Sequence, residues 1–107
     1  MVVIETQVFT KRVQALLTDE EYRDFQNFLA EHPDIGNIIQ GSGGLRKVRW
    51  AAKGHGKRGG ARVIYYWAVE KDRLFMLFIF AKNERADLSA AQIKALRRIV
   101  EEEYHER

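Results

Sequence analysis

Two long apolar runs near the middle of the chain constrain its fold more than any other feature. Residues 61–69 are ARVIYYWAV and residues 74–81 are LFMLFIFA, with the polar residues EKDR between them. β-Branched and aromatic residues favour strands, and a nearly continuous apolar strand favours burial on both faces. Two such runs joined by a short polar turn predict a buried hairpin or meander.

Strand and helix patterns flank this hairpin. VVIETQVF (2–9) predicts a first strand, and residues 10–17 are expected to form a short helix. LRKVRWAA (45–52) alternates imperfectly between apolar and cationic residues, which is consistent with a strand containing a bulge or an edge position. The connection at 34–44 is rich in Gly, Asn and Ser and predicts a loop.

Two longer helices are marked by their start signals. Thr18 and Glu21 have the spacing of a capping box, which predicts a helix that Pro33 ends. Ser89 and Gln92 repeat that spacing before the last helix. The apolar residues expected to face the core recur at helical intervals: Tyr22, Phe25 and Leu29 in the first of these helices, and Ile93, Leu96, Val100 and Tyr104 in the last.

The predicted order is therefore β-α-α-β-β-β-α, an α+β fold. A length of 107 residues fits a single domain, here 1–107, and 46% hydrophobic residues are enough for one core. An antiparallel sheet with the helices packed on one face is the expected two-layer arrangement.

Charge is distributed very unevenly along the chain. Residues 1–34 carry three Lys/Arg and seven Asp/Glu, whereas residues 35–69 carry seven Lys/Arg and no acidic residue. Residues 70–107 carry eight of each sign, which gives a net charge of +3 for the whole chain. A cationic middle third is typical of proteins that bind a polyanion, and nucleic acid is the expected one.

Composition and motifs argue against several other classes. The chain has no cysteine, so disulfide frameworks and thiolate zinc sites are excluded. Gly54, Gly56 and Gly59 match the string GxGxxG, but a strand is expected after them where a dinucleotide site needs a helix. No metal site or cofactor is predicted. Without a long apolar run or a secretory signal, we expect a soluble, cytoplasmic protein with no membrane partner.

The stretch GHGKRGGAR, residues 54–62, contains four glycines, three fixed cations and one histidine. Glycine allows the backbone to come close to a ligand, and Lys and Arg bind phosphates. The stretch therefore predicts a phosphate-facing loop. His55 is interpreted as either a neutral base or an incidental loop residue.

Cations alone can cleave RNA, because RNA carries its own nucleophile in the 2′-hydroxyl. A protein has to align that hydroxyl, accept its proton, neutralise the phosphate and protonate the leaving oxygen. A lysine crowded by other cations can act as the base, and the planar guanidinium of arginine suits a phosphate clamp. Antiparallel pairing of 61–69 with 74–82 would place Lys82 beside Arg62. The residues that can supply these functions are Lys53, Lys57, Arg58, Arg62 and Lys82.

Three strings occur in the chain in a familiar order: IIQGSGGLRKVR, KGHGKRGGARVIYYW and LFIFAKNERADLS. They resemble the RelE/ParE superfamily of bacterial toxins, and most nearly its HigB-type branch, over almost the whole chain. The resemblance implies a RelE-like fold and the toxin of a type II toxin–antitoxin system. It also implies a ribosome-dependent endoribonuclease (mRNA interferase) that cleaves mRNA in the 30S A site, without metal, and leaves a 2′,3′-cyclic phosphate.

The resemblance further implies partners and site residues. The expected partners are a cognate antitoxin, with a DNA-binding helix-turn-helix, together with the ribosome and mRNA. Lys53 or Lys57 is expected to act as the base, Arg62 as the transition-state clamp, and Lys82 as a phosphate contact or acid. The remaining RNA contacts are expected from Arg46, Lys47, Arg49, His55, Arg58, Asn83 and Glu84.

The chain also departs from the RelE branch, which has an arginine at the position of Asn83 and a tyrosine at that of Ser89. Because that tyrosine has been given a base role, the catalytic work is expected to be distributed differently here. Two alternatives remain open: a gyrase poison like those of the ParE branch, and an RNA-binding module without catalysis. Tyr65, Tyr66 and Trp67 are expected mainly to pack in the core.

Overall fold

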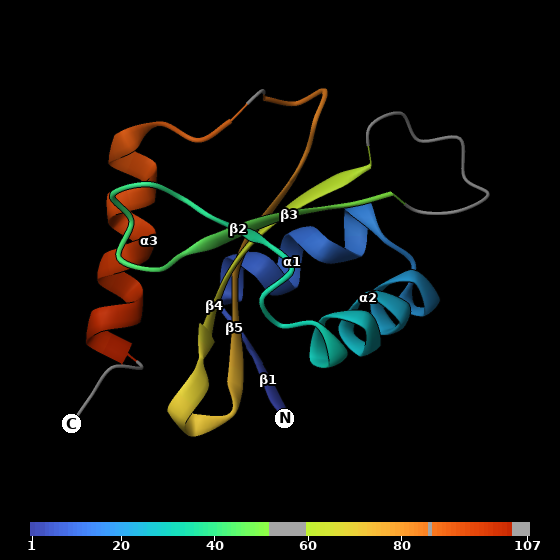
Figure 1. The fold of residues 1–107 in the computed structure, drawn as a ribbon. Helices are drawn as coiled ribbons and strands as arrows, with labels where there is room; N and C mark the ends of the chain where they lie inside the picture. Colours follow the sequence, from blue (N-terminus) through green and yellow to red (C-terminus); the bar gives the residue numbers. More distant parts are fainter. Residues whose placement is uncertain (52–59, 86, 104–107) are drawn as a thin grey trace.

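The computed structural model describes residues 1–51, 60–85 and 87–103, in which one five-stranded sheet lies between helices (Figure 1). In chain order its elements are β1 (Val2–Glu5), α1 (Gln7–Leu16), α2 (Asp19–Glu31), β2 (Asn37–Ile38), β3 (Arg46–Trp50), β4 (Ala61–Ala68), the 3₁₀ turn η1 (Val69–Lys71), β5 (Arg73–Ala81) and α3 (Ala90–Glu103). None of the helices in the described part of the chain is long and apolar enough to cross a membrane.

The predicted hairpin forms the centre of the sheet. The strand order is β1-β5-β4-β3-β2, and β4 pairs with β5 in antiparallel fashion from Ala61 opposite Ala81 to Ala68 opposite Arg73. The turn between them closes on Asp72, whose φ of 55° lies in the left-handed region that Asp tolerates better than most residues. The apolar runs thus predict both strands to within about one residue.

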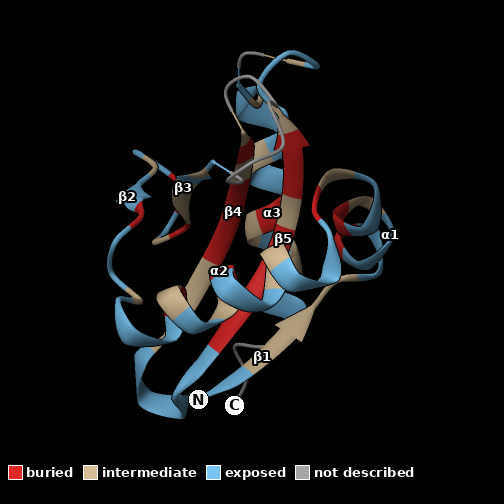
Figure 2. Cartoon of the chain, turned by 90° about the vertical axis from the view of Figure 1, so that its right-hand side faces the viewer, coloured by how far each residue is buried: buried red, intermediate tan, exposed pale blue. Residues whose placement is uncertain are grey.

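Helices cover both faces of this sheet. On one face, Val63 and Tyr65 of β4 pack against α1 and α2; on the other, Ile64 packs in a second core that includes Leu96 and Val100 of α3. Figure 2 shows the buried stretches of β4 and β5 running between these helical layers. The expectation of helices on one face is wrong, because consecutive residues of β4 and β5 are apolar and each face needs a cover. The α+β class is confirmed.

The N-terminal segment differs from the prediction. The first strand stops at Glu5, and α1 begins at Gln7 instead of residue 10. Thr6 is the N-cap of α1, since its hydroxyl accepts a hydrogen bond from the backbone N–H of Phe9 at 3.1 Å. This cap turns Phe9 into the α1–α2 core, where it is fully buried. In addition, β1 runs parallel to β5, so the sheet is only mostly antiparallel.

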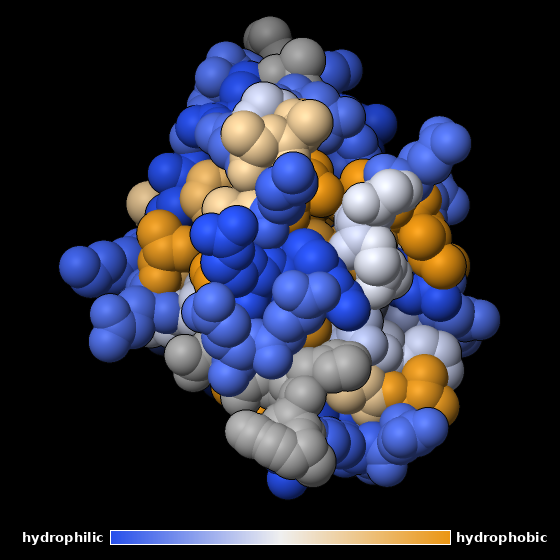
Figure 3. All heavy atoms as spheres, turned by 90° about the vertical axis from the view of Figure 1, so that its left-hand side faces the viewer, coloured by the Kyte–Doolittle hydropathy of each residue, from blue (hydrophilic) through white to orange (hydrophobic). Residues whose placement is uncertain are grey.

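Both predicted capping boxes are present. The N–H of Glu21 donates to the Thr18 hydroxyl at 3.1 Å, and the Glu21 carboxylate accepts from the Thr18 N–H at 2.8 Å. Ser89 and Gln92 make the same reciprocal pair, at 3.1 and 2.8 Å. Seen from the side of α3, the surface is mainly hydrophilic, with patches of apolar side chains between the polar ones (Figure 3). The start signals therefore place α2 and α3 correctly.

The string GSGG is explained by a tight connection between β2 and β3. The Ser42 hydroxyl donates to the carbonyl of Ile39 at 2.6 Å and accepts from the N–H of Leu45 at 3.0 Å, which closes the loop. Gly43 has a φ of +75°, and a Cβ there would lie 2.7 Å from Nε of Arg97. The loop thus packs directly under α3. The two-residue strand β2 lies within the segment predicted to be loop throughout.

Candidate functional site

Three cations lie on the α3-facing side of β3 and β4. Arg49 pairs with Arg62, and Lys47 pairs with Ile64, a residue of the α3-side core. Because paired residues share a face and strand side chains alternate, Lys47, Arg49 and Arg62 point to the same side of the sheet. We call these three residues the cationic row. Like charges directly opposite one another on neighbouring strands repel, so the pairing of Arg49 with Arg62 is by itself unfavourable for the sheet.

The end of β5 lies beside the start of β4, next to the cationic row. Ala81 is opposite Ala61, and Phe80 is opposite Arg62. Lys82 and Asn83 follow in an exposed turn. The antiparallel pairing predicted from the sequence therefore brings Lys82 to the Arg62 end of the sheet.

Glu84 closes the turn that carries Lys82 and Asn83. Its Oε1 accepts from the N–H of Ala81 at 3.0 Å, and its other oxygen pairs with Arg12 of α1. The Ala81 N–H, together with the Arg12 guanidinium, lowers the pKa of the Glu84 carboxyl. Arg12 in turn donates from Nε to the carbonyl of Ile79 at 2.7 Å. The Glu84 carboxylate is therefore engaged within the protein and positions the turn.

Asp87 is a site residue that the sequence analysis missed. Its Oδ2 lies 2.7 Å from Nζ of Lys47, and its Oδ1 accepts from the N–H of Leu88 at 2.8 Å. The hydrogen bond from Lys47 is the main cause that lowers the pKa of Asp87, and the charge of Arg62 adds to it. Lys47 and Asp87 are 40 residues apart. No local spacing connects them, so only the sheet reveals the contact.

The other predicted site residues fall into two groups. Arg46 lies on the opposite face from the cationic row, where its Nη1 donates to the carbonyls of Asp34 at 3.1 Å and Gly36 at 2.8 Å. It holds the connection between α2 and β2. The predicted residues Lys53, His55, Lys57 and Arg58 lie outside the described residues.

The aromatic residues of β4 serve the core, as expected. Tyr65 is fully buried, and its hydroxyl donates to the carbonyl of Pro33 at 2.7 Å and accepts from the N–H of Gly36 at 2.9 Å. The ring of Tyr66 stacks on Phe75 in the α3-side core. A buried, doubly hydrogen-bonded Tyr65 has no face left for stacking on a base.

Gly60, at the entrance to β4, has a structural reason to be glycine. Its φ is +61°, and a Cβ there would lie 2.3 Å from the backbone oxygen of Trp50. This glycine therefore allows β3 and β4 to approach each other closely at the end where Arg49 and Arg62 face one another.

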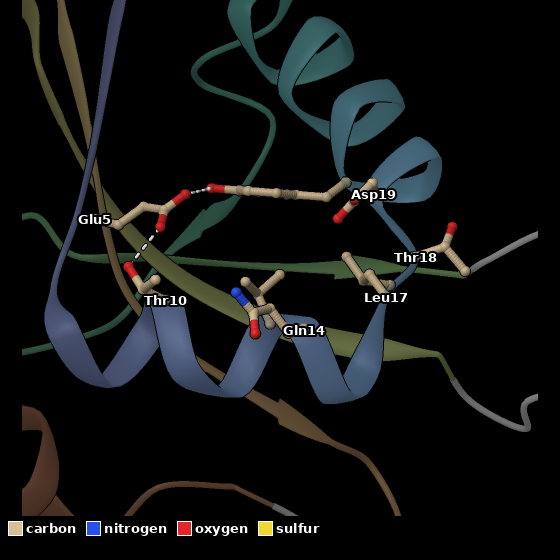
Figure 4. A pocket seen from close by; sticks show the side chains of 8 residues that line it. Glu5, Thr10, Gln14, Leu17, Thr18 and Asp19 are labelled. Carbon is tan, nitrogen blue, oxygen red and sulfur yellow. Dashed lines mark hydrogen bonds between the residues drawn. The ribbon is translucent and has the colours of Figure 1, made fainter.

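A separate cavity of about 130 Å³ lies between α1 and the start of α2 (Figure 4). The Glu5 carboxylate lies in it and accepts hydrogen bonds from the hydroxyls of Thr10 at 2.6 Å and Tyr22 at 2.5 Å. Burial, together with the Glu5 carboxylate, raises the pKa of Tyr22. These contacts join β1, α1 and α2 on the face opposite the cationic row. Among the described residues, no three His, Asp or Glu side chains are grouped to bind a metal ion.

The chain matches a known protein family. Residues 30–105 match the family described as the RelE toxin of the RelE/RelB toxin–antitoxin system, which is more than half of the chain. The chain belongs to the RelE toxin family. Its similarity to the superfamily, inferred above from three strings, is thereby confirmed, whereas the HigB-type branch stays a prediction.

Solved structures show the same fold. A double arginine-to-alanine mutant of the E. coli toxin RelE in the free state superimposes with a TM-score of 0.62 at 19% identity, over 92% of this chain and 96% of that one. The isolated E. coli RelE toxin gives 0.59 at 20%, over 92% and 97%. A chain of the intact E. coli RelBE toxin–antitoxin complex gives 0.57 at 18%, over 75% and 94%. At these identities the likeness establishes the RelE fold.

Proposed function

We propose that this RelE family toxin is a ribosome-dependent endoribonuclease that cleaves mRNA in the A site and so inhibits translation. The observation that carries the proposal is the facing pair of Arg49 and Arg62 beside the turn of Lys82. Arg49 and Arg62 are direct partners in the register of β3 and β4, so both side chains can bind a phosphate at this end of the sheet. Family membership supports RNA as the source of the phosphate.

The proposed reaction is a transesterification within the RNA. The 2′-oxygen forms a bond to the adjacent phosphorus, and the bond from phosphorus to the 5′-oxygen breaks. The products are a 2′,3′-cyclic phosphate and a 5′-hydroxyl. Arg62 stabilises the additional negative charge on the phosphate in the transition state, a contribution that is about 10²- to 10³-fold for one well-placed donor.

Proton transfer is assigned to lysines. Lys53 or Lys57 accepts the proton of the 2′-hydroxyl, and Lys82 either contacts the phosphate or donates a proton to the leaving 5′-oxygen. No metal and no cofactor take part. Lys47, Arg49, Arg58, His55 and Asn83 contribute RNA contacts, whereas Arg46 and Glu84 support the surrounding backbone.

A cognate antitoxin is the proposed protein partner. The fold shared with a chain of the E. coli RelBE toxin–antitoxin complex supports an antitoxin of this kind for the present chain. A DNA-binding helix-turn-helix in that antitoxin belongs to the same proposal, because it would link toxin binding to control of the operon.

Primer extension on a defined mRNA in a purified translation system tests the proposal. Four reactions are compared: the protein, Arg62→Ala, Arg73→Ala, and the protein without ribosomes. Arg73 is exposed at the far end of β5, so its removal changes the net charge equally but leaves the site intact. New 5′ ends in A-site codons that need ribosomes and Arg62, but not Arg73, are the expected result.

Other outcomes identify the alternatives. Cuts that persist without ribosomes identify a free ribonuclease. No cuts, with DNA breaks in a gyrase reaction, identify a gyrase poison. Association with RNA without cuts or breaks identifies a binding module.

A further inference from the structure

An acidic side chain lies against the cationic row. Asp87 lies in the connection between β5 and α3. Its Oδ2 is 2.7 Å from Nζ of Lys47 on β3. The strand β4 lies between β5 and β3, and the charge of its residue Arg62 also acts on this carboxylate. The carboxylate makes with Lys47 the kind of charge-assisted contact that a phosphodiester oxygen would make.

The ion pair is open to solvent. The side chain of Asp87 is 56% exposed and that of Lys47 is 32% exposed. Exposed pairs of this kind contribute little to stability, so a competing anion can separate them at small cost. A ligand can reach Lys47 without unfolding any element of the sheet.

Asp87 has a second contact that is kept when another anion replaces it on Lys47. Its Oδ1 accepts from the N–H of Leu88 at 2.8 Å, close to Ser89, whose hydroxyl caps α3. After separation from Lys47, the carboxylate remains hydrogen-bonded and solvated at the helix entrance. The exchange therefore leaves α3 in place.

We propose that Asp87 is an internal competitor for RNA: its carboxylate occupies the phosphate position on Lys47 in the unbound toxin and is displaced when a phosphodiester binds. The identification of the anion as RNA rests on the proposed function, whereas the anion position itself rests on the contact between Lys47 and Asp87. The charge at residue 87 thereby sets how readily the toxin binds RNA. Asp87 is a tuning residue of the binding site and takes no part in bond making.

The test is the affinity for a short single-stranded RNA in which every sugar is 2′-O-methylated, so that it binds but lacks the nucleophile. Fluorescence anisotropy at several salt concentrations compares the wild type with Asp87→Asn and Asp24→Asn. Asp24 is exposed on α2, across the sheet from the site, and controls for the change in net charge. Asp87→Asn is expected to tighten binding about two- to fivefold. The salt slope should be nearly the same for both proteins, because Lys47 neutralises one RNA phosphate in the bound state of each.

Repeating the comparison in the Lys47→Gln variant tests whether the effect of Asp87→Asn depends on Lys47. In Lys47→Gln, the substitution Asp87→Asn is expected to change the affinity much less, since the pair that RNA must separate is already gone. Equal or weaker binding by Asp87→Asn in the wild-type background overturns the proposal. So does equal tightening by Asp24→Asn, or an undiminished effect in Lys47→Gln.

The binding measurement and the cleavage assay test the two proposals independently, so either proposal can be wrong while the other stands. If no mRNA is cut while Asp87→Asn still tightens binding through Lys47, the nuclease proposal is wrong and the internal competitor stands. If mRNA is cut in the A site but Asp87→Asn leaves the affinity unchanged, the nuclease stands and the competitor is wrong.

Discussion

Arg49 on β3 and Arg62 on β4 lie directly opposite each other, on the face of the sheet that carries α3. Like charges at facing positions destabilise a sheet, and most surface strands avoid them. In the proposed site, this pair and Lys82 lie where an RNA phosphate would bind. Arg62 is therefore expected to matter more for function than for stability.

The first prediction follows from this difference. In Arg62→Gln, the free energy of unfolding is expected to change by less than about 0.5 kcal/mol, because the repulsion by Arg49 and the attraction to Asp87 are lost together. A-site cleavage should fall about 10²- to 10³-fold. Urea denaturation and primer extension measure the two effects. A marked loss of stability would show that Arg62 holds the fold together instead of serving the site.

A second prediction separates two glycines of similar backbone conformation. Gly41 and Gly60 have φ values of +74° and +61°, so an Ala at either is strained by about 1 kcal/mol. Around Gly41 there is nothing within 4 Å of an added Cβ, whereas at Gly60 the Cβ would lie 2.3 Å from the Trp50 oxygen. Gly60→Ala should therefore lower the free energy of unfolding by about 1–3 kcal/mol more than Gly41→Ala in denaturant titrations. Equal losses would contradict the close approach of β3 and β4.

A third prediction concerns the two tyrosines of β4. Tyr65→Phe removes the partner of the Gly36 N–H and the donor to the Pro33 carbonyl, so the free energy of unfolding should fall by about 1–3 kcal/mol. Tyr66→Phe is the matched control on the other face of the strand, with its ring on Phe75. Cleavage per folded molecule should be unchanged in Tyr65→Phe. A selective loss of cleavage would instead assign Tyr65 to RNA.

Features determined by neighbouring residues could be predicted from the sequence. The β4–β5 hairpin follows from two apolar runs and their polar turn, and the starts of α2 and α3 follow from Thr18 and Ser89. The position of Lys82 beside the start of β4 followed from antiparallel pairing alone. Each of these inferences needed only periodicity, caps or strand direction.

Long-range and very short features could not be predicted. The parallel pairing of β1 with β5 joins segments about 70 residues apart, as Ile4 opposite Phe75 shows, and no local pattern encodes it. The two-residue strand β2 is too short for a period of two to be visible. At the N-terminus, the Thr6 cap overrides the strand preference of Val8 and Phe9, which follow it in α1. The contact between Lys47 and Asp87 depends on the packing of three separate segments.

The last prediction concerns acid stability. In the folded protein the pKa of Glu84 is lowered mainly by the Ala81 N–H and then by Arg12, and that of Asp87 mainly by Lys47. Both carboxylates therefore contribute stability that is fully present above their ordinary pKa of about 4 and is lost as the pH falls below it. The free energy of unfolding should be nearly flat between about pH 7 and 5 with respect to these groups, and should fall below about pH 4.

Glu84→Gln and Asp87→Asn should each make that decline shallower, because one proton-binding group with a lowered pKa is gone. Glu102→Gln, which removes an exposed carboxylate of α3, is the control for the loss of one negative charge. Urea denaturation at a series of pH values, with constant ionic strength, measures the slopes. If Glu84→Gln and Glu102→Gln have the same slope, the Glu84 carboxylate does not hold the turn that carries Lys82, and its hydrogen bond to the Ala81 N–H is absent in solution.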